Sequence, residues 1–191
     1  MFRDLSQSIN SIKELDDWNF TEQTSFHLSA VLIPIITSQN TDSILLTKRS
    51  EELNHHPGQV SFPGGRAESS DKNALDTALR ETHEEVGISK DIIKVAGFLD
   101  QHTTVSDFII TPIVGIIDSG YQTRVDPVEV DYAFEVPCEV LLDESNYQRS
   151  KIFWQGEMRH FWELHYEEHH IWGATASILR NFALRLTDLK K

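Results

Sequence analysis

Apolar residues along this chain gather into short runs that are separated by polar, glycine-rich and proline-rich segments. Two runs, at residues 27–37 and 108–117, are almost continuously apolar and rich in β-branched side chains. Such runs are typical of strands that lie inside a sheet and are covered on both faces. Shorter apolar runs predict further strands at residues 43–47, 92–99, 130–136, 152–154 and 160–164. Turn residues join the strands at 27–37 and 43–47, which can therefore form a hairpin, as can the last two.

Helical spacing of apolar residues predicts two substantial helices, one from about Lys72 to Val86 and one that follows residues 172–175 and runs to about Leu186. Gly87 is a natural stop for the first of them. The residues that could cap its start are Ser69, Ser70 and Asp71. Shorter helices are predicted at residues 9–18 and 138–142. Strands mixed with helices in this order indicate the α/β class, with a mixed sheet flanked by helices.

The length of 191 residues suits one domain with one core. With 39% hydrophobic and 25% charged residues, the composition is that of an ordinary globular protein. We expect residues 1–26 to form an N-terminal extension that packs on a single domain of residues 27–191. The one cysteine, Cys138, excludes an internal disulfide, and we expect it to be a packed thiol, since no base lies near it in the sequence.

The formal net charge of −13 argues against a protein that binds nucleic acid through its phosphates, because such binding requires a basic surface. A small polyanionic substrate is compatible with this charge, since a divalent metal and a few basic residues can hold phosphates locally. No apolar run reaches the roughly 20 residues of a membrane span, and the first residues do not resemble a signal peptide. We therefore expect a cytoplasmic protein, monomeric or homodimeric, that acts on a small molecule and binds neither nucleic acid nor membrane.

Three glutamates, Glu81, Glu84 and Glu85, lie within five positions of the helix predicted at residues 72–86. At about 100° per residue they share an arc of roughly 100°, beside an apolar arc that can pack on the sheet. Carboxylates this close repel one another unless a cation lies among them, and oxygen ligands suit hard ions such as Mg²⁺ or Mn²⁺. A solvated acidic face is the simpler interpretation. The Pro-Gly-Gly loop before the helix favours a metal site, because glycines let the backbone approach a ligand closely.

The segment from Gly65 to Ile88 resembles the Nudix box, which reads G-x5-E-x7-R-E-U-x-E-E-x-G-U with U an aliphatic residue. The second half of this motif is matched by Arg80, Glu81, Thr82, His83, Glu84, Glu85, Val86, Gly87 and Ile88. Only Thr82 departs from the motif there, because an aliphatic residue is usual at its position. In the first half Asp71 takes the acidic position, and eight residues rather than seven separate it from Arg80. The resemblance implies the Nudix fold, an α/β/α sandwich, and hydrolysis of a diphosphate linked to another moiety.

Upstream residues resemble an additional signature of the coenzyme A diphosphatase branch of this superfamily, roughly L-L-T-x-R-S/A-x3-R-x3-G-x3-F-P-G-G. The matching residues are Leu45, Leu46, Thr47, Arg49, Ser50, Gly58, Phe62, Pro63, Gly64 and Gly65. Asn54 stands where an arginine is usual, and residues 172–176 resemble the W-G-x-T-A of the same branch. For this branch the resemblance implies coenzyme A or a derivative as the substrate. The products would be 3′,5′-ADP and 4′-phosphopantetheine, or an acylated form of the latter.

The resemblance also suggests roles for the acidic residues. Glu81 and Glu85 are the expected principal ligands of Mg²⁺ or Mn²⁺, and Glu84 is a further or water-mediated ligand. Glu84 and Glu129 are both candidates for the general base, because a carboxylate on a later loop serves in several relatives. A solvated loop acid is the simpler interpretation of Glu129. His102 is a second candidate for this proton transfer.

Basic residues and glycines complete the predicted site. Arg80 is expected to pair with a glutamate and orient the helix carboxylates, with direct contact to phosphate as the alternative. The candidates for substrate binding are Lys48, Arg49, His56, Gly64 and Gly65. Of the two neighbouring cations we favour Arg49, because side chains alternate along a strand and both are not expected to point inward. His56 could instead be a hydrogen-bonding spacer in its loop.

Two other functions stay open. One is a Nudix hydrolase that acts on another nucleoside diphosphate derivative, such as ADP-ribose or a dinucleotide, since Asn54 replaces the usual arginine. The other is a ligand-binding module of this fold without turnover. The complete set of helix glutamates argues against the module, because a protein that only binds has no need of all three charges.

Overall fold

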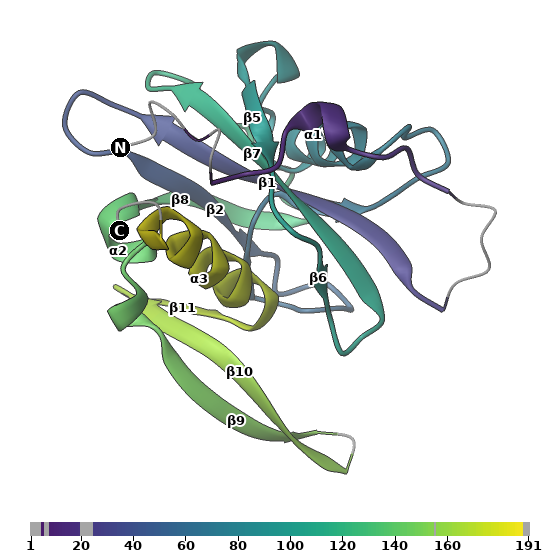
Figure 1. The fold of residues 1–191 in the computed structure, drawn as a ribbon, viewed down its shortest axis with the longest axis vertical. Coiled ribbons are helices and arrows are strands. Elements are labelled where there is room, and N and C mark those ends of the chain that lie inside the picture. Colours follow the sequence, from purple (N-terminus) through teal and green to yellow (C-terminus); the bar gives the residue numbers. More distant parts are fainter. Residues whose placement is uncertain (1–4, 6–7, 20–24, 155, 189–191) are drawn as a thin grey trace.

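The computed structural model describes residues 5, 8–19, 25–154 and 156–188, and it shows a mixed sheet between helices (Figure 1). The predicted α/β class with flanking helices is confirmed. The main sheet has eight strands in the order β3-β2-β1-β7-β5, with β4 paired to β1, β6 to β7 and β8 to β2. Its strands are β1 (His27–Thr37), β2 (Ser43–Arg49), β3 (Val60–Ser61), β4 (Gly64–Arg66), β5 (Lys94–Phe98), β6 (His102–Thr103), β7 (Phe108–Asp118) and β8 (Val130–Pro137).

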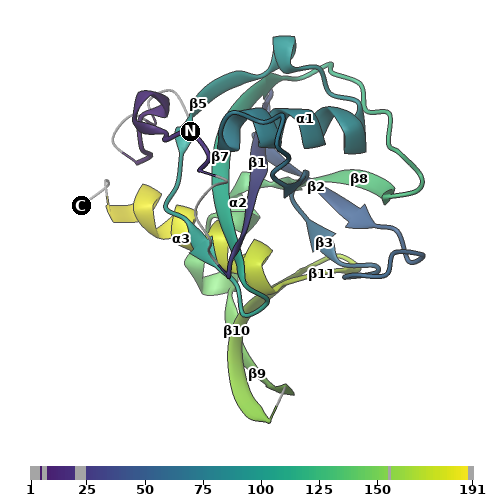
Figure 2. The same ribbon diagram turned by 90° about the vertical axis from the view of Figure 1, so that its right-hand side faces the viewer.

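The two long apolar strands, β1 and β7, lie side by side at the centre and run parallel along their whole length. Because both are covered on both faces, their near-continuous hydrophobicity has a direct structural reason. The predicted hairpin of β1 and β2 is present as an antiparallel pair. Helix α1 (Ala74–Val86) covers one face of the sheet, and α3 (Gly173–Asp188) lies on the opposite side (Figure 2).

Two hydrophobic clusters follow from this layering, one on each side of the central strands. Leu32 of β1 packs in the cluster that includes Ala78 of α1, while its neighbour Ile33 packs with Phe182 of α3. Consecutive residues of a strand point to opposite faces, so one apolar run supplies both clusters.

A second, three-stranded sheet consists of β9 (Gln148–Trp154), β10 (Glu157–Tyr166) and β11 (His169–Trp172). The predicted hairpin of residues 152–154 and 160–164 forms its first two strands, which are longer than predicted and extend away from the body of the protein (Figures 1 and 2). Leu164 and Ile171 are buried in the cluster of α3. Strand β11 was not predicted, because its four residues carry too short an apolar pattern.

Helix α1 begins later than predicted, at Ala74, and its cap is Asn73 rather than Ser69, Ser70 or Asp71. The side chain of Asn73 accepts hydrogen bonds from the backbone N–H groups of Leu75 and Asp76, at 3.1 and 3.3 Å. The helix ends as predicted at Gly87, which has the left-handed φ of 71°. The remaining short helices are α2 (Cys138–Leu141), η1 (Ile12–Glu14), η2 (Lys90–Ile92) and η3 (Glu144–Asn146).

The N-terminal helix predicted at residues 9–18 is wrong in extent, because only the single 3₁₀ turn at Ile12–Glu14 forms. The residues that flank this turn, Ser11 and Leu15, are extended, and neighbouring residues contact the domain. Asn10 pairs with Phe98 of β5 through two backbone hydrogen bonds, and the indole Nε1 of Trp18 donates to Thr77 of α1 at 3.0 Å. Pairing with the edge of the sheet takes the place of further helical turns.

None of the helices in the described part of the chain combines the length and the apolar character that a bilayer span requires.

The two-sided core makes a prediction about stability. Leu32→Ala and Ile33→Ala should each lower the free energy of unfolding by about 2–5 kcal/mol, because each side chain is fully buried and leaves a cavity on its own face of β1. Val128→Ala is the control, since Val128 is 71% exposed and should change stability by less than about 0.5 kcal/mol. Urea denaturation of the three variants measures this. Loss of stability in only one of the two β1 variants would contradict the two-sided arrangement.

Candidate metal-dependent active site

Three carboxylates from two parts of the chain meet beside the glycine loop. Glu81 and Glu85 project from α1, and Glu129 comes from the loop that precedes β8. One oxygen of each lies within 4.8 Å of the others. The first two are one helical turn apart, so α1 alone brings them together. Glu129 joins them because the backbone N–H of Ser50, after β2, donates to its carbonyl oxygen at 2.9 Å.

Glu85 is the innermost of these acids, with only 1% of its surface exposed. Its Oε2 accepts the backbone N–H of Gly64 at 3.1 Å, and its Oε1 lies 3.5 Å from Nη1 of Arg49. These contacts do not offset the loss of water, and burial raises the pKa of Glu85 to about 8. Burial raises the pKa of Glu81 as well, although Arg80 opposes the shift. The two acids need a further cation to be stable together as anions near neutral pH.

The two glycines of the loop lie in strand β4, which pairs with β1. A Cβ atom on Gly64 would lie 2.5 Å from the carbonyl oxygen of Ala30, and one on Gly65 would lie 2.5 Å from the carboxyl carbon of Glu81. Both distances are far below a normal contact. Glycine is therefore required at Gly64, where the neighbour is the backbone of β1, whereas a side chain at Gly65 would displace the carboxylate of Glu81.

Arg80 is bound on several sides, and its strongest partner is Asp71. Its Nε donates to Oδ1 of Asp71 at 3.0 Å and its Nη2 donates to Oδ2 at 2.9 Å, a bidentate arrangement. Asp71 is buried, and it also accepts from the hydroxyl of Thr77 at 2.9 Å. The hydrogen bonds to Asp71 raise the pKa of Arg80. Asp71 thus reaches Arg80 although the segment between them is one residue longer than in the Nudix box.

The same guanidinium also contacts two of the helix glutamates. Nη1 of Arg80 lies 2.9 Å from Oε1 of Glu81 and 2.8 Å from Oε2 of Glu84. Glu84 is about half exposed and, among the described residues, is not part of the group whose oxygens lie within 4.8 Å. Arg80 therefore links Asp71, which precedes the helix, to the acidic edge of α1, where one of its nitrogens contacts both Glu81 and Glu84.

The two cations at the end of β2 point to different partners. Lys48 pairs with Glu51 at 3.0 Å, whereas Arg49 reaches Glu85. The pairing of β2 with β8 shifts register between these two residues, and such a bulge changes the direction of a side chain. Arg49 is thus beside the carboxylate cluster and Lys48 is not. His56 lies in the loop between β2 and β3, is exposed and has a positive φ of 57°.

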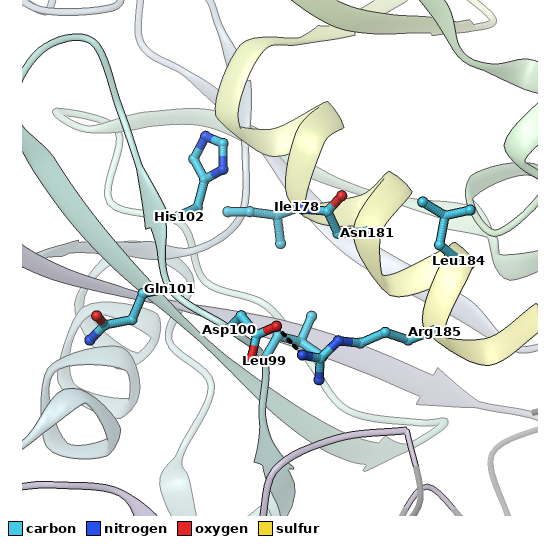
Figure 3. Close-up of a pocket in the computed structure, with 8 residues that line it drawn as sticks. All are labelled: Leu99, Asp100, Gln101, His102, Ile178, Asn181, Leu184 and Arg185. Atoms are coloured by element: carbon cyan, nitrogen blue, oxygen red, sulfur yellow. Dashed lines mark hydrogen bonds and ion pairs between the residues drawn. The ribbon is translucent and has the colours of Figure 1, made fainter. Parts of the chain in front are cut away.

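His102 lies in a different place, a cavity of about 230 Å³ between the β5–β6 connection and α3 (Figure 3). An ion pair between Asp100 and Arg185 joins the two sides of this cavity. None of the three clustered glutamates lines it. Burial lowers the pKa of the His102 imidazole. Cys138 is buried and free, and burial raises the pKa of its thiol to about 12, which removes it as a nucleophile.

The cluster of Glu81, Glu85 and Glu129 beside the glycine loop offers only oxygen ligands, which suits the binding of a divalent metal ion. The chain belongs to the Nudix family, since the NUDIX domain matches residues 26–153. Nudix hydrolases act on the diphosphate bonds of nucleoside diphosphate derivatives and generally use divalent ions such as Mg²⁺.

Relatives of similar length support this membership. The chain is 38% identical over 158 residues to an uncharacterized Nudix hydrolase NudL of Enterobacter sp. (strain 638), covering 83% of this chain and 82% of that protein. It is 38% identical over 165 residues to the NudL of Escherichia coli (strain K12), covering 86% and 85%.

Among solved structures, the fold is similar to the MutT protein from Methanosarcina mazei Go1, with a TM-score of 0.58 at 16% identity over 89% of this chain and 99% of that one. The MutT/nudix family protein from Enterococcus faecalis gives a TM-score of 0.54 at 15% identity, over 90% and 66%. At this level of identity the likeness concerns the fold alone.

The residues present fit a divalent metal on their own chemistry. Glu81, Glu85 and Glu129 offer only oxygen ligands, which hard cations prefer. Glu85 is buried with a raised pKa and has one N–H donor and one cation at 3.5 Å as partners. A divalent ion held by these three carboxylates would neutralise their mutual repulsion.

The raised pKa of Glu85 predicts how stability depends on pH when metal is removed with EDTA. Because the folded pKa of about 8 exceeds the unfolded value of about 4.3, this group's contribution is complete below pH 4.3 and is lost as the pH rises toward 8. Glu85→Gln should abolish that loss, so the variant should be the more stable protein at pH 8, by on the order of a few kcal/mol.

Denaturant unfolding of both proteins in EDTA at pH 5 and pH 8 measures the difference. Mg²⁺ should raise the stability of the wild type at pH 8 more than that of Glu85→Gln, because binding to the folded state stabilises it. Equal pH dependence in the two proteins would refute the assigned environment of Glu85.

Proposed function

We propose that this Nudix hydrolase cleaves the diphosphate bond of coenzyme A or its derivatives, giving 3′,5′-ADP and 4′-phosphopantetheine or its acylated form. The observation that carries the proposal is the contact between the carboxylate cluster and the segments that resemble the coenzyme A diphosphatase signature. Arg49 of that signature lies beside Glu85, and Ser50 binds the backbone of Glu129.

The three separate pieces of the signature also touch one another. Thr47 of β2 bonds through its hydroxyl to Ser61 of β3, with 3.1 Å between the two hydroxyl oxygens. Thr175, at the start of α3, donates to the carbonyl oxygen of Val60 at 3.2 Å. The segments at 45–50, 58–65 and 172–176 therefore form one structural unit around β3. Such contact between segments that lie far apart in the sequence is expected if all three help to bind the same substrate.

The mechanism assigns each residue by its position. A bound Mg²⁺ or Mn²⁺ would neutralise the diphosphate and lower the pKa of a coordinated water. Glu81 and Glu85 would hold the metal, with Glu129 beside them, while Gly64 and Arg49 fix the carboxylate of Glu85. The side chain of Arg49 is 23% exposed beside the cluster, so other N–H groups of its guanidinium can contact a bound anion.

Glu129 is the better candidate for the general base. Its carboxylate belongs to the cluster and is exposed at its edge, where it can accept the proton of an attacking water. Glu84 is the alternative base and a possible ligand of a further ion, but its carboxylate is bound to Arg80 at 2.8 Å. Arg80 holds the helix acids in position through Asp71 and is a positioning residue rather than a group that contacts the phosphate.

The substrate carries several phosphate charges, and this protein has a net charge of −13. Local cations must therefore supplement the metal. We assign phosphate contacts to Arg49, with Lys48 and His56 as further candidates, and place the backbone of Gly64 and Gly65 against the diphosphate. A Nudix hydrolase of ADP-ribose or of a dinucleotide is the second candidate, because the exposed Asn54 replaces an arginine of the signature.

A substrate comparison tests the proposed function. Purified protein with Mg²⁺ or Mn²⁺ is offered coenzyme A, ADP-ribose and NADH, and the products are separated by chromatography. Coenzyme A should be cleaved to 3′,5′-ADP with a kcat/KM at least about tenfold above the others, equivalent to about 1.4 kcal/mol. Turnover of ADP-ribose alone would contradict the substrate assignment, and saturable binding without turnover would indicate a binding module.

The two candidate bases are separated by a matched pair of variants. Glu129→Gln should lower kcat by about 10²–10⁴-fold, as expected for loss of a general base, whereas Glu84→Gln should have a smaller effect. Steady-state kinetics at saturating Mg²⁺ measure both, and circular dichroism checks that each variant is folded. A larger loss in Glu84→Gln would transfer the role to Glu84.

A further inference from the structure

A second group of possible metal ligands lies far along the chain from the glutamates of α1, on the three-stranded sheet. Glu163 and His165 are two apart on β10 and therefore point to the same face. His170 of β11 is directly opposite His165 in the antiparallel register. The intervening Leu164 is buried on the face that packs toward α3, so the three polar side chains lie on the outer face of this sheet.

The ligand atoms of these three residues already lie close together. One ligand atom of each lies within 4.8 Å of the other two. Nε2 of His170 is 2.5 Å from Oε2 of Glu163, and the rings of His165 and His170 are stacked with centroids 4.5 Å apart and planes 6° from parallel. A cross-strand pair is held at this spacing by the backbone ladder itself.

Neighbouring side chains hold Glu163 and His170 in position. The hydroxyl of Ser150, on β9, donates to Oε1 of Glu163 and leaves Oε2 facing the histidines. The ring of Trp172 stacks on that of His170 with a centroid distance of 6.2 Å. The carboxylate is therefore positioned by a neighbour that is not itself a ligand, which is the usual arrangement around protein metal sites.

From this geometry we propose that Glu163, His165 and His170 form a binding site for a borderline transition-metal ion, Zn²⁺ in particular, that is separate from the site on α1. Two imidazole nitrogens and one carboxylate oxygen match the ligand preference of Zn²⁺, with the fourth position open to water. The all-oxygen cluster of Glu81, Glu85 and Glu129 suits Mg²⁺ or Mn²⁺ instead. The two sites therefore differ in the ion that their ligand atoms prefer.

Binding requires only small movements of side chains. In a zinc site each ligand atom is about 2.0–2.2 Å from the metal. The His170–Glu163 hydrogen bond must open to admit the ion, and the rings must turn so that one nitrogen of each faces it. Since His165 and His170 are exposed, such rotations meet little resistance. The bound ion would link β10 to β11 through its ligands and stabilise the folded sheet.

The test uses the full chain in saturating Mg²⁺, so that the α1 cluster is already occupied. Zn²⁺ is titrated by calorimetry, and the ring signals of the histidines are followed by ¹H–¹⁵N NMR. We expect one Zn²⁺ per chain, with shifts confined to His165 and His170. The double substitution His165→Ala with His170→Ala should weaken binding at least about tenfold.

Further variants make the result specific. Ser150→Ala should weaken Zn²⁺ binding less than the double substitution, because Ser150 only orients Glu163. His160→Ala is the matched control, since His160 is exposed on the same strand but its side chain points to the opposite face of the sheet. Glu163→Gln supplies an independent loss of one ligand if the double variant does not fold.

Two results would overturn the site. One is Zn²⁺ binding that is as tight in the double variant or in Glu163→Gln as in the wild type. The other is Zn²⁺ binding that Mg²⁺ displaces or that Glu85→Gln removes, because the ion would then occupy the cluster on α1. Neither outcome depends on whether coenzyme A is the substrate.

Discussion

The burial of the Glu85 carboxylate is the constraint on which the site depends. A carboxylate taken out of water is costly as an anion unless positive charge or hydrogen bonds replace the lost solvation. Here the backbone N–H of Gly64 and the guanidinium of Arg49 provide part of that replacement. The remainder creates a demand for a divalent cation, and Glu81 and Glu129 lie where they can share it. A divalent ion bound there would supply the positive charge that these two contacts leave missing.

The surrounding structure maintains this arrangement through rigid elements. Strand β4 lies so close to β1 that Gly64 admits no side chain, and a side chain at Gly65 would displace the carboxylate of Glu81. Asp71 holds Arg80 through two hydrogen bonds. Burial favours the protonated form of Asp71, but the hydrogen bonds from Arg80 prevail and lower its pKa. Helix α1 is also packed on the sheet through its apolar face. Loop, helix and strand therefore cannot move independently of the carboxylates.

The central strands, both long helices and the acidic helix edge could be predicted from the sequence, because continuous apolar runs and helical spacing are strong local signals. The cap at Asn73 could not, since it depends on Asp71 being occupied by Arg80 and Thr77. Membership of Glu129 in the cluster depends on a long-range contact with Ser50 that no local pattern encodes. The cross-strand pair of His165 and His170 was likewise hidden, because β11 is too short to be recognised before its register is known.

The most direct test of this account is the binding of Mn²⁺ to metal-free protein at pH 8, followed through the EPR signal of free Mn²⁺. The account predicts that the wild type binds Mn²⁺ and that Glu85→Gln and Glu81→Gln each bind it at least about tenfold more weakly, a loss of about 1.4 kcal/mol. Glu84→Gln should change the affinity less. Binding of Mn²⁺ to Glu85→Gln as tight as to the wild type would contradict the assignment of the buried carboxylate as the principal metal ligand.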